Sequence, residues 1–394
     1  MNILFINNLP FNPTLGGIER VTDILTKSFI KHTNHKIFYL SDNIDDQTML
    51  EYDFPVPMYT LPEKGLFSSL NNIKYYNDFI TSNNIDIIIN QRGLEFNFNK
   101  SLDVKSVKKI TVVHSTPHAY LKAYSKVFVL NKNIKDCINN IVKIFAYPYF
   151  YIRNRKRAFN RLSNHYNYIS NNSNAIVLLS KNYIKEYLSF NIIRKDIPVY
   201  SIPNPNTFSN LIGNWEEKEN IILFVGRLVY EDKNPLQLLK IWKRLYKKYS
   251  NWKLFFVGDG PELYKMQSYI QKYNITNVYF EGSRNNVVDY YKKASFICLT
   301  SNYEGWPMAL IEGMTLGCIP IAFNSFRAVT DIIDEGINGH IINDYNIKEY
   351  ANKLSNLMTD ESKRKRMFNE AQLKAKEFNV KNVITKWEEV INSI

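Results

Sequence analysis

Short apolar runs alternate with longer amphipathic segments along the whole chain. The runs consist mainly of Ile, Val, Leu and Phe, and the segments between them repeat apolar residues every three or four positions. This alternation is typical of strand–helix units built around parallel sheets that are buried on both faces. We therefore expect strands at residues 3–6, 37–40, 85–89, 110–113, 175–179 and 199–202, and then at residues 221–225, 254–257, 278–280, 296–299, 319–323 and 340–342.

The pattern stops once, between the two groups of strands. Residues 202–220 contain two prolines, a glycine and many polar residues without periodicity, so they are expected to form a linker. A chain of 394 residues suits two domains. We predict an α/β fold of two doubly wound Rossmann-like domains that face a central cleft, at residues 1–210 and 211–378.

The last segment, residues 379–394, is predicted to form a helix with one apolar face. No strand follows it, so the pattern leaves open which domain it packs against.

The composition is that of a globular protein, with 45% hydrophobic and 22% charged residues. The sequence contains no apolar stretch of the roughly 18 residues that a spanning helix needs, and it begins directly with a strand pattern, so we expect a cytoplasmic location. The net charge of +13 favours an anionic partner, which could be a nucleotide sugar, an anionic membrane surface or a nucleic acid.

One segment concentrates this positive charge. Residues 143–161 contain six cations and no acid, interleaved with aromatic residues, as in a segment that lies in an anionic membrane interface. A partly buried helix pair with a solvated basic face is an equally good interpretation. Binding to single-stranded nucleic acid is disfavoured, because no nucleic-acid motif accompanies the segment. The cations that define the membrane hypothesis are Arg153, Arg155, Lys156 and Arg157.

In the first domain two features lie at strand ends, where doubly wound folds bind ligands. Gly16 and Gly17 precede a helical pattern, and such a pair can bring backbone amides close to an anion or simply form a tight turn. His114 follows the strand at residues 110–113. Position alone makes it either a site residue or a hydrogen-bonded structural histidine.

In the second domain two cations follow the first strand. Arg227 and Lys233 lie on either side of a strand-to-helix loop and could clamp a diphosphate, although surface cations are common in this chain. The next strand ends in a similar way, with Gly258 and Gly260 in a turn, and we interpret that turn as scaffold.

The most informative stretch is SNYEGWPMALIEGM. Pro307 suits the first turn of a helix and Gly317 suits its end, which places Glu304 before the helix and Glu312 inside it. Carboxylates can accept hydrogen bonds from sugar hydroxyls, and amides at a helix start can face an anion. One loop and helix could therefore hold both ends of a nucleotide sugar.

This stretch resembles the retaining glycosyltransferase family 4, in which two glutamates are separated by seven residues. The resemblance extends in family order over GGIERV, VVHSTP, IPNPN, VGRLVYEDKNP, VGDGPEL, FEGSRNN and GINGHI. It implies a GT-B fold, a nucleotide-sugar donor, retention of anomeric configuration and no essential metal. The form EGWPMALIEG is similar to that of bacterial enzymes that assemble surface polysaccharides.

The resemblance also assigns roles by position. His114 and Glu304 would face the donor sugar, and Glu312 would bind the ribose. Arg227 and Lys233 would neutralise the diphosphate. Pro307 replaces a glycine of the commoner family pattern and cannot donate an amide hydrogen, so the amides of Trp306 and Met308 are the expected donors. The other expected donor-binding residues are Gly16, Gly17, Arg227, Lys233, Ser283 and Arg284.

The sequence itself offers no obvious metal site, because it contains no Asp-x-Asp and no Cys pair at ligand spacing. We therefore expect a metal-independent hexosyltransferase without a cofactor, which uses a nucleotide-sugar donor, most simply a UDP-sugar. The acceptor would be a lipid-linked or surface glycan of lipopolysaccharide, O-antigen or capsule, bound by the first domain, with the enzyme peripheral on the inner membrane face. A nucleotide-sugar epimerase or phosphorylase on the same fold and a non-catalytic basic binding module are the alternatives.

Overall fold

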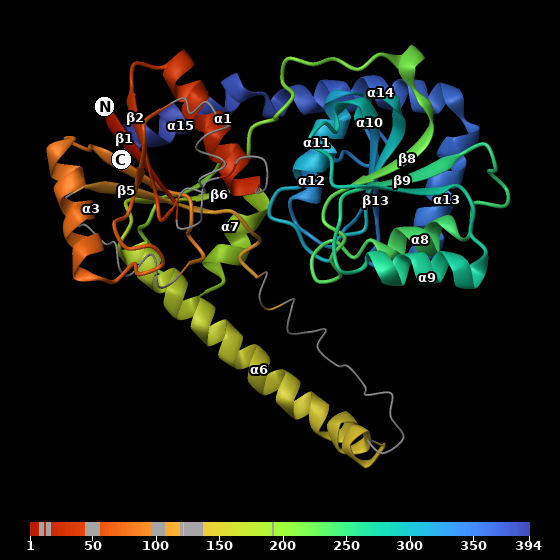
Figure 1. Cartoon of the computed structure of the whole chain (residues 1–394), viewed down its shortest axis with the longest axis horizontal. Helices are drawn as coiled ribbons and strands as arrows, with labels where there is room; N and C mark the ends of the chain where they lie inside the picture. Colours follow the sequence, from red (N-terminus) through yellow and green to blue (C-terminus); the bar gives the residue numbers. More distant parts are fainter. Residues whose placement is uncertain are drawn as a thin grey trace.

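The computed structural model describes residues 1–7, 12, 17–43, 56–95, 107–118, 121, 137–190 and 193–394, and for residues 137–150 it describes the backbone only. Within these residues the chain forms two parallel sheets, each flanked by helices (Figure 1). The predicted fold of two doubly wound α/β domains is confirmed.

The first domain contains a 7-stranded sheet in the order β3-β2-β1-β4-β5-β6-β7. Its strands are β1 (Asn2–Asn7), β2 (Lys36–Ser41), β3 (Met58–Thr60), β4 (Ile87–Asn90), β5 (Lys108–Val113), β6 (Ala175–Leu178) and β7 (Val199–Ser201). Its principal helices are α1 (Gly17–His32), α3 (Leu70–Ser82), α6 (Cys137–Asn171) and α7 (Lys181–Leu188).

The second domain contains a 6-stranded sheet in the order β10-β9-β8-β11-β12-β13. Its strands are β8 (Glu219–Val225), β9 (Lys253–Val257), β10 (Val278–Gly282), β11 (Ala294–Leu299), β12 (Ile319–Phe323) and β13 (His340–Ile342). The helices are α8 (Leu236–Trp242), α9 (Leu263–Tyr273), α10 (Val288–Lys293), α11 (Met308–Thr315), α12 (Val329–Ile332), α13 (Ile347–Thr359) and α14 (Glu361–Ala375), followed by α15 (Val380–Ser393).

Both strand orders reverse direction beside the first strand of the domain. The reversal lies between β1 and β4 in the first sheet and between β8 and β11 in the second. Loops that leave neighbouring strands at such a point diverge to opposite faces of the sheet and open a crevice at its carboxyl edge. Each domain therefore has one position where the topology itself favours a binding site.

The alternation of side chains along β1 shows how the first sheet is buried. Ile3 and Phe5 belong to the large apolar cluster that contains α1, whereas Leu4 and Ile6 belong to a smaller cluster that contains α3. The two faces are therefore covered by different helices, as the uninterrupted apolar run predicts.

Every predicted apolar run overlaps a strand, and β3 is the strand that the sequence analysis missed. It spans three residues at the edge of the sheet, and its side chains are half-buried or exposed. A short edge strand of this kind has no continuous apolar run for a pattern to detect.

The C-terminal helix α15 docks on the first domain. It packs against α1, and His35 Nε2 lies 3.0 Å from Glu388 Oε1. Tyr200, in β7, lies 2.8 Å from Ser393 through their hydroxyls. The chain therefore crosses between the domains twice, once after β7 and again between α14 and α15 (Figure 1).

Helix α6 is one continuous helix of 35 residues that includes the whole basic aromatic segment. Figure 1 shows its N-terminal half projecting away from both sheets. The segment therefore forms a single helix and not the helix pair of the second interpretation, and its residues 153–157 are exposed to solvent. None of the helices described in the structure is long and apolar enough to cross a membrane.

The docking of α15 predicts the effect of removing its largest buried side chain. Trp387 is 3% exposed, and truncation of a buried Trp to Ala costs about 3–5 kcal/mol. We expect Trp387→Ala to lower the free energy of unfolding, measured by chemical denaturation, by about this amount. Lys386→Ala, at an exposed position of the same helix, is the control and should leave it nearly unchanged. Equal stability of the two variants would show that α15 is not docked.

Candidate donor-binding cleft

A cleft of about 670 Å³ lies between the domains, where the loops after β8 and β11 face the start of α1 and the end of β5. It therefore occupies the reversal point of the second sheet. Gly16 lies outside the described residues. The residues predicted from the sequence that line the cleft are Gly17, His114, Arg227, Lys233, Ser283, Arg284, Glu304, Trp306, Met308 and Glu312.

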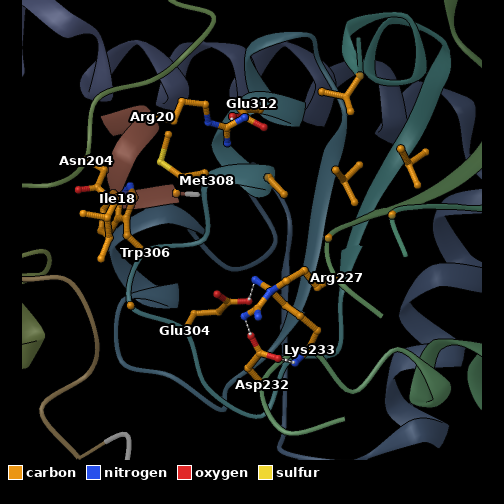
Figure 2. A pocket seen from close by; sticks show the side chains of 18 of the residues that line it. Ile18, Arg20, Asn204, Arg227, Asp232, Lys233, Glu304, Trp306, Met308 and Glu312 are labelled. Atoms are coloured by element: carbon orange, nitrogen blue, oxygen red, sulfur yellow. Dashed lines mark hydrogen bonds and ion pairs between the residues drawn. The ribbon is translucent and has the colours of Figure 1, made fainter. Parts of the chain in front are cut away.

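Glu304 is held at the floor of this cleft by residues of its own domain. Lys233 Nζ lies 2.6 Å from Glu304 Oε1 (Figure 2). The Ser301 hydroxyl donates to the same oxygen over 2.7 Å. The Glu304 side chain is 9% exposed and that of Lys233 is 20% exposed. A buried carboxylate needs such partners. The ion pair also joins Lys233 and Glu304, two residues that the sequence analysis had assigned to the donor site from separate motifs.

Arg227 is paired differently. Its guanidinium lies 2.7 Å from Asp232 Oδ2, and the Arg227 side chain is 72% exposed. Asp232 Oδ1 also accepts the backbone N–H of Lys233 over 3.0 Å. The acid therefore braces the loop, while the mostly exposed arginine can turn towards a ligand at little cost.

Glu312 is 2% exposed and is contacted from three directions. Arg20 of α1 lies 2.9 Å from Oε1 across the cleft, and the Thr207 hydroxyl donates to Oε1 over 2.8 Å. The Tyr291 hydroxyl donates to Oε2 over 3.0 Å, and burial raises the pKa of Tyr291 far above its usual value. Glu312 therefore ties α1, the linker and the second domain together.

The start of α11 differs from the expectation in one respect. The backbone N–H of Met308 donates to the carbonyl of Trp306 over 2.9 Å, around Pro307. This amide already has an intramolecular acceptor, so the expected anion contact from the Met308 N–H is not available in this conformation. Met308 lines the cleft through its side chain (Figure 2).

The turn after β9 also differs from the expectation, because Gly258 and Asp259 line the cleft. A Cβ atom at Gly258 would lie 2.0 Å from the carbonyl oxygen of Gly226, and Gly258 has a φ of +137°. The turns after β8 and β9 therefore press directly on each other, which requires a glycine. This turn, interpreted from the sequence as scaffold, forms part of the cleft wall.

Several lining residues were missed by the sequence analysis, chiefly Ile18, Arg20, Asn204, Asp232 and Gly305. Arg20 follows Gly17 by three residues, and that proximity was the available signal. Asn204 lies in the segment interpreted as linker, yet it is 8% exposed. Buried linker asparagines have no periodic pattern that would reveal them.

His114 directly follows β5 and lines the cleft from the first domain. Its Nε2 lies 2.5 Å from Gln91 Oε1. Burial, with a smaller effect from Arg92, lowers the pKa of His114 to about 3, so the imidazole is neutral at physiological pH. In this arrangement Nε2 carries the proton that the amide oxygen accepts. Nδ1 is then an acceptor, buried and without a partner among the described residues.

Among the described residues, no group of three or more His, Cys, Asp or Glu side chains is arranged to hold a metal ion. The charged residues that line the cleft are Arg20, Arg227, Lys233, Arg284, Asp232, Asp259, Glu304 and Glu312.

Two doubly wound domains with a cleft at the reversal point of the second define the GT-B class. The overall fold superposes on Anabaena HepE, solved with UDP and glucose, with a TM-score of 0.74 at 15% identity, covering 100% of this chain and 99% of that one. It also superposes on the lipopolysaccharide outer core galactosyltransferase WaaB, with a TM-score of 0.67 at 20% identity and coverage of 100% and 99%. At these identities the likeness shows the fold, and the predicted GT-B fold is confirmed.

Residues 209–374, which make up most of the second domain, match the family described as glycosyl transferases group 1. The chain is 30% identical to the amylovoran biosynthesis glycosyltransferase AmsD of Erwinia amylovora over 53% of its own length and 59% of the relative's. It is 31% identical to a GalNAc-alpha-(1->4)-GalNAc-alpha-(1->3)-diNAcBac-PP-undecaprenol alpha-1,4-N-acetyl-D-galactosaminyltransferase of Campylobacter jejuni, over 48% and 54%. The chain spans a little over half the length of these relatives. The predicted resemblance to bacterial surface polysaccharide glycosyltransferases is confirmed.

The buried, neutral state of His114 predicts a pH dependence of stability. Because the pKa is lower in the folded protein than in the unfolded chain, the unfolded chain binds more protons between pH 6.5 and about 3. The contribution of His114 to the free energy of unfolding is therefore fully present above pH 6.5. It falls as the pH decreases, by at most about 1.4 kcal/mol per pH unit. We expect His114→Gln to lose less stability than the parent between pH 6.5 and 4.5, measured by denaturant titration at each pH.

The exposed His32 provides the control, since His32→Gln removes an imidazole without changing a buried site. A pH dependence in His114→Gln as steep as that of the parent would contradict the burial of a neutral imidazole.

Proposed function

We propose that this protein is a retaining hexosyltransferase that moves a sugar from a UDP-sugar to a lipid-linked or surface glycan, such as lipopolysaccharide, O-antigen or capsule. The observation that carries the proposal is the convergence of Arg227, Lys233, Glu304 and Glu312 in one interdomain cleft. The comparisons support it, because AmsD is named as a glycosyltransferase of amylovoran biosynthesis and WaaB as a lipopolysaccharide outer core galactosyltransferase, and HepE was solved with UDP and glucose.

In this proposal the diphosphate lies between Arg227 and Lys233, and the donor sugar lies over Glu304. The base is placed near Ser283 and Arg284, at the end of the cleft formed after β10. His114 faces the sugar from the first domain, where Nδ1 can accept a hydrogen bond from a hydroxyl.

Glu312 is the proposed ribose ligand, and its present contacts set a condition for that role. A carboxylate accepts about four hydrogen bonds, and Glu312 already accepts from Arg20, Thr207 and Tyr291. Both ribose hydroxyls can therefore bind only if one donor leaves. Arg20 is the one that can do so, since its side chain is 36% exposed and reaches Glu312 from the other domain.

In the proposed chemistry no side chain acts as a nucleophile or forms a covalent bond to the sugar. The acceptor hydroxyl attacks the anomeric carbon from the face of the leaving group, the bond from that carbon to the diphosphate oxygen breaks, and the donor phosphate takes the hydroxyl proton. Arg227 and Lys233 stabilise the charge that develops on the diphosphate, in the role that a metal ion has in other transferases. We therefore propose that the reaction needs no metal.

The cation assignment is tested with Arg227→Gln and Lys233→Gln. Hydrogen bonds to charged groups are worth roughly 1.5–3 kcal/mol, so each variant should bind UDP at least about tenfold more weakly in calorimetric titration. The exposed Lys247→Gln lowers the net charge equally and should bind UDP as the parent does. Unchanged affinity in both cleft variants would remove the donor-site assignment.

The same preparations distinguish the alternative functions. A transferase consumes the donor only when an acceptor is present, whereas an epimerase converts UDP-sugar alone and a phosphorylase requires phosphate. A basic binding module would show no affinity for UDP.

The acceptor is proposed to bind the first domain, because the donor residues occupy the second and the acceptor must approach across the cleft. The Campylobacter relative is named for a PP-undecaprenol saccharide, which supports a lipid-linked acceptor. Helix α6 supports a peripheral position at the inner membrane face. Ile152 on this helix is 65% exposed, and the exposed cations beside it are Arg153, Arg155, Lys156 and Arg157.

Membrane binding is tested by replacing those four cations of α6 with Gln. Near an anionic surface each cation contributes about 1 kcal/mol, weakened by salt. We expect the parent to sediment with vesicles that contain anionic lipid, less so at high salt, and the quadruple variant to remain in solution with unchanged UDP affinity.

A control variant carries four substitutions of exposed cations elsewhere, Lys247, Lys365, Arg366 and Lys386 to Gln. It has the same net charge and should still bind the vesicles. Equal vesicle binding by the α6 variant and the parent would show that the cations of α6 do not hold the protein at the membrane.

A further inference from the structure

The loop that carries Glu304 is contacted by the first domain at its backbone. The hydroxyl of Tyr183, in α7, donates to the carbonyl oxygen of Glu304 over 2.7 Å. Tyr183 is fully buried and Glu304 is 8% exposed. The main energetic effect of losing this hydrogen bond would be to leave the buried Glu304 carbonyl without a donor, which costs more free energy than the bond itself contributes.

Helix α7 is seated on the second domain by a separate set of polar contacts. Ser180 caps the helix by accepting the backbone N–H of Asn182 over 3.1 Å, and its hydroxyl lies 2.5 Å from Asp331 Oδ2. The side-chain amide of Asn182 donates to Asp331 Oδ1 over 2.8 Å. Asp331 belongs to α12, so the position of Tyr183 relative to the Glu304 loop is set by an interdomain contact.

The next residue of the loop is pressed against the first domain as well. A Cβ atom at Gly305 would lie 2.0 Å from the carbonyl oxygen of His114. The loop backbone therefore lies between α7 and the end of β5. The Glu304 carboxylate, in contrast, is held by Lys233 and Ser301 of the second domain.

We propose that Tyr183 is a positioning residue for transfer, whose hydroxyl fixes the Glu304 peptide so that the carboxylate meets the donor sugar while the two domains are in contact. The inference rests on the proposed function for the role of Glu304. It adds a residue of the first domain that acts on the donor sugar through the backbone of the second domain. Burial raises the pKa of the Tyr183 hydroxyl, so it remains a donor at any physiological pH.

The chain offers a matched pair of variants for the test. Tyr187 lies one turn later on α7, is also fully buried, and its hydroxyl has no hydrogen-bond partner among the described residues. Tyr183→Phe and Tyr187→Phe therefore each remove one buried oxygen from the same helix, and only the first removes a bond to the Glu304 loop.

The measurements are UDP affinity and UDP-sugar affinity by calorimetry, kcat and KM for transfer, and the thermal midpoint. We expect Tyr183→Phe to bind UDP within about twofold of the parent, to lose part of the extra affinity contributed by the sugar, and to lower kcat by about tenfold. Tyr187→Phe should match the parent in all of these.

A kcat for Tyr183→Phe equal to that of the parent would overturn the inference alone. A parallel loss of kcat, UDP affinity and thermal midpoint in both variants would also overturn it, because it would show a general packing effect of α7. Failure of the parent itself to bind UDP would overturn the proposed function, and this inference with it.

Discussion

The arrangement of the cleft depends on the cost of burying two carboxylates. An unpaired buried charge costs several kcal/mol, so Glu304 and Glu312 could occupy this position only with partners that are built into the fold. Glu304 takes Lys233 and Ser301 from the second domain, whereas Glu312 takes Arg20 from α1 and Thr207 from the linker. The pairing of the second carboxylate therefore also connects the first domain to the second across the cleft.

These pairs leave little surplus charge for a ligand. The cleft lining holds four basic residues (Arg20, Arg227, Lys233 and Arg284) and four acidic ones (Asp232, Asp259, Glu304 and Glu312), so the net charge of +13 is carried elsewhere on the protein. A diphosphate would therefore have to draw cations away from acids that already hold them. Such exchange is inexpensive for the exposed Arg227 and more costly for the half-buried Lys233.

Much of the fold follows from local pattern, because strands buried on both faces must be apolar throughout. The cleft residues that follow strand ends, such as Arg227 and Glu304, were predictable for the same topological reason. Arg20 and Tyr183 were not, because their partners Glu312 and Glu304 are distant in sequence and no spacing connects them. The docking of α15 was undetermined for a similar reason, since an apolar face does not specify which apolar surface covers it. The hydrogen bond from the Met308 amide to the Trp306 carbonyl was not foreseen, because it depends on a local turn of the backbone around Pro307.

The two crossings of the chain between the domains lie side by side. The backbone N–H of Asn206 in the first crossing donates to the carbonyl of Phe378 in the second over 2.8 Å. Two crossings at one place can act as a hinge, which permits the domains to rotate about one axis and resists their sliding past each other. Thr207, whose hydroxyl donates a hydrogen bond to Glu312, is the residue next to Asn206 in the first crossing. If the domains rotate about this contact, displacement would grow along the cleft with distance from it, so the end of the cleft that holds Glu312 would move least.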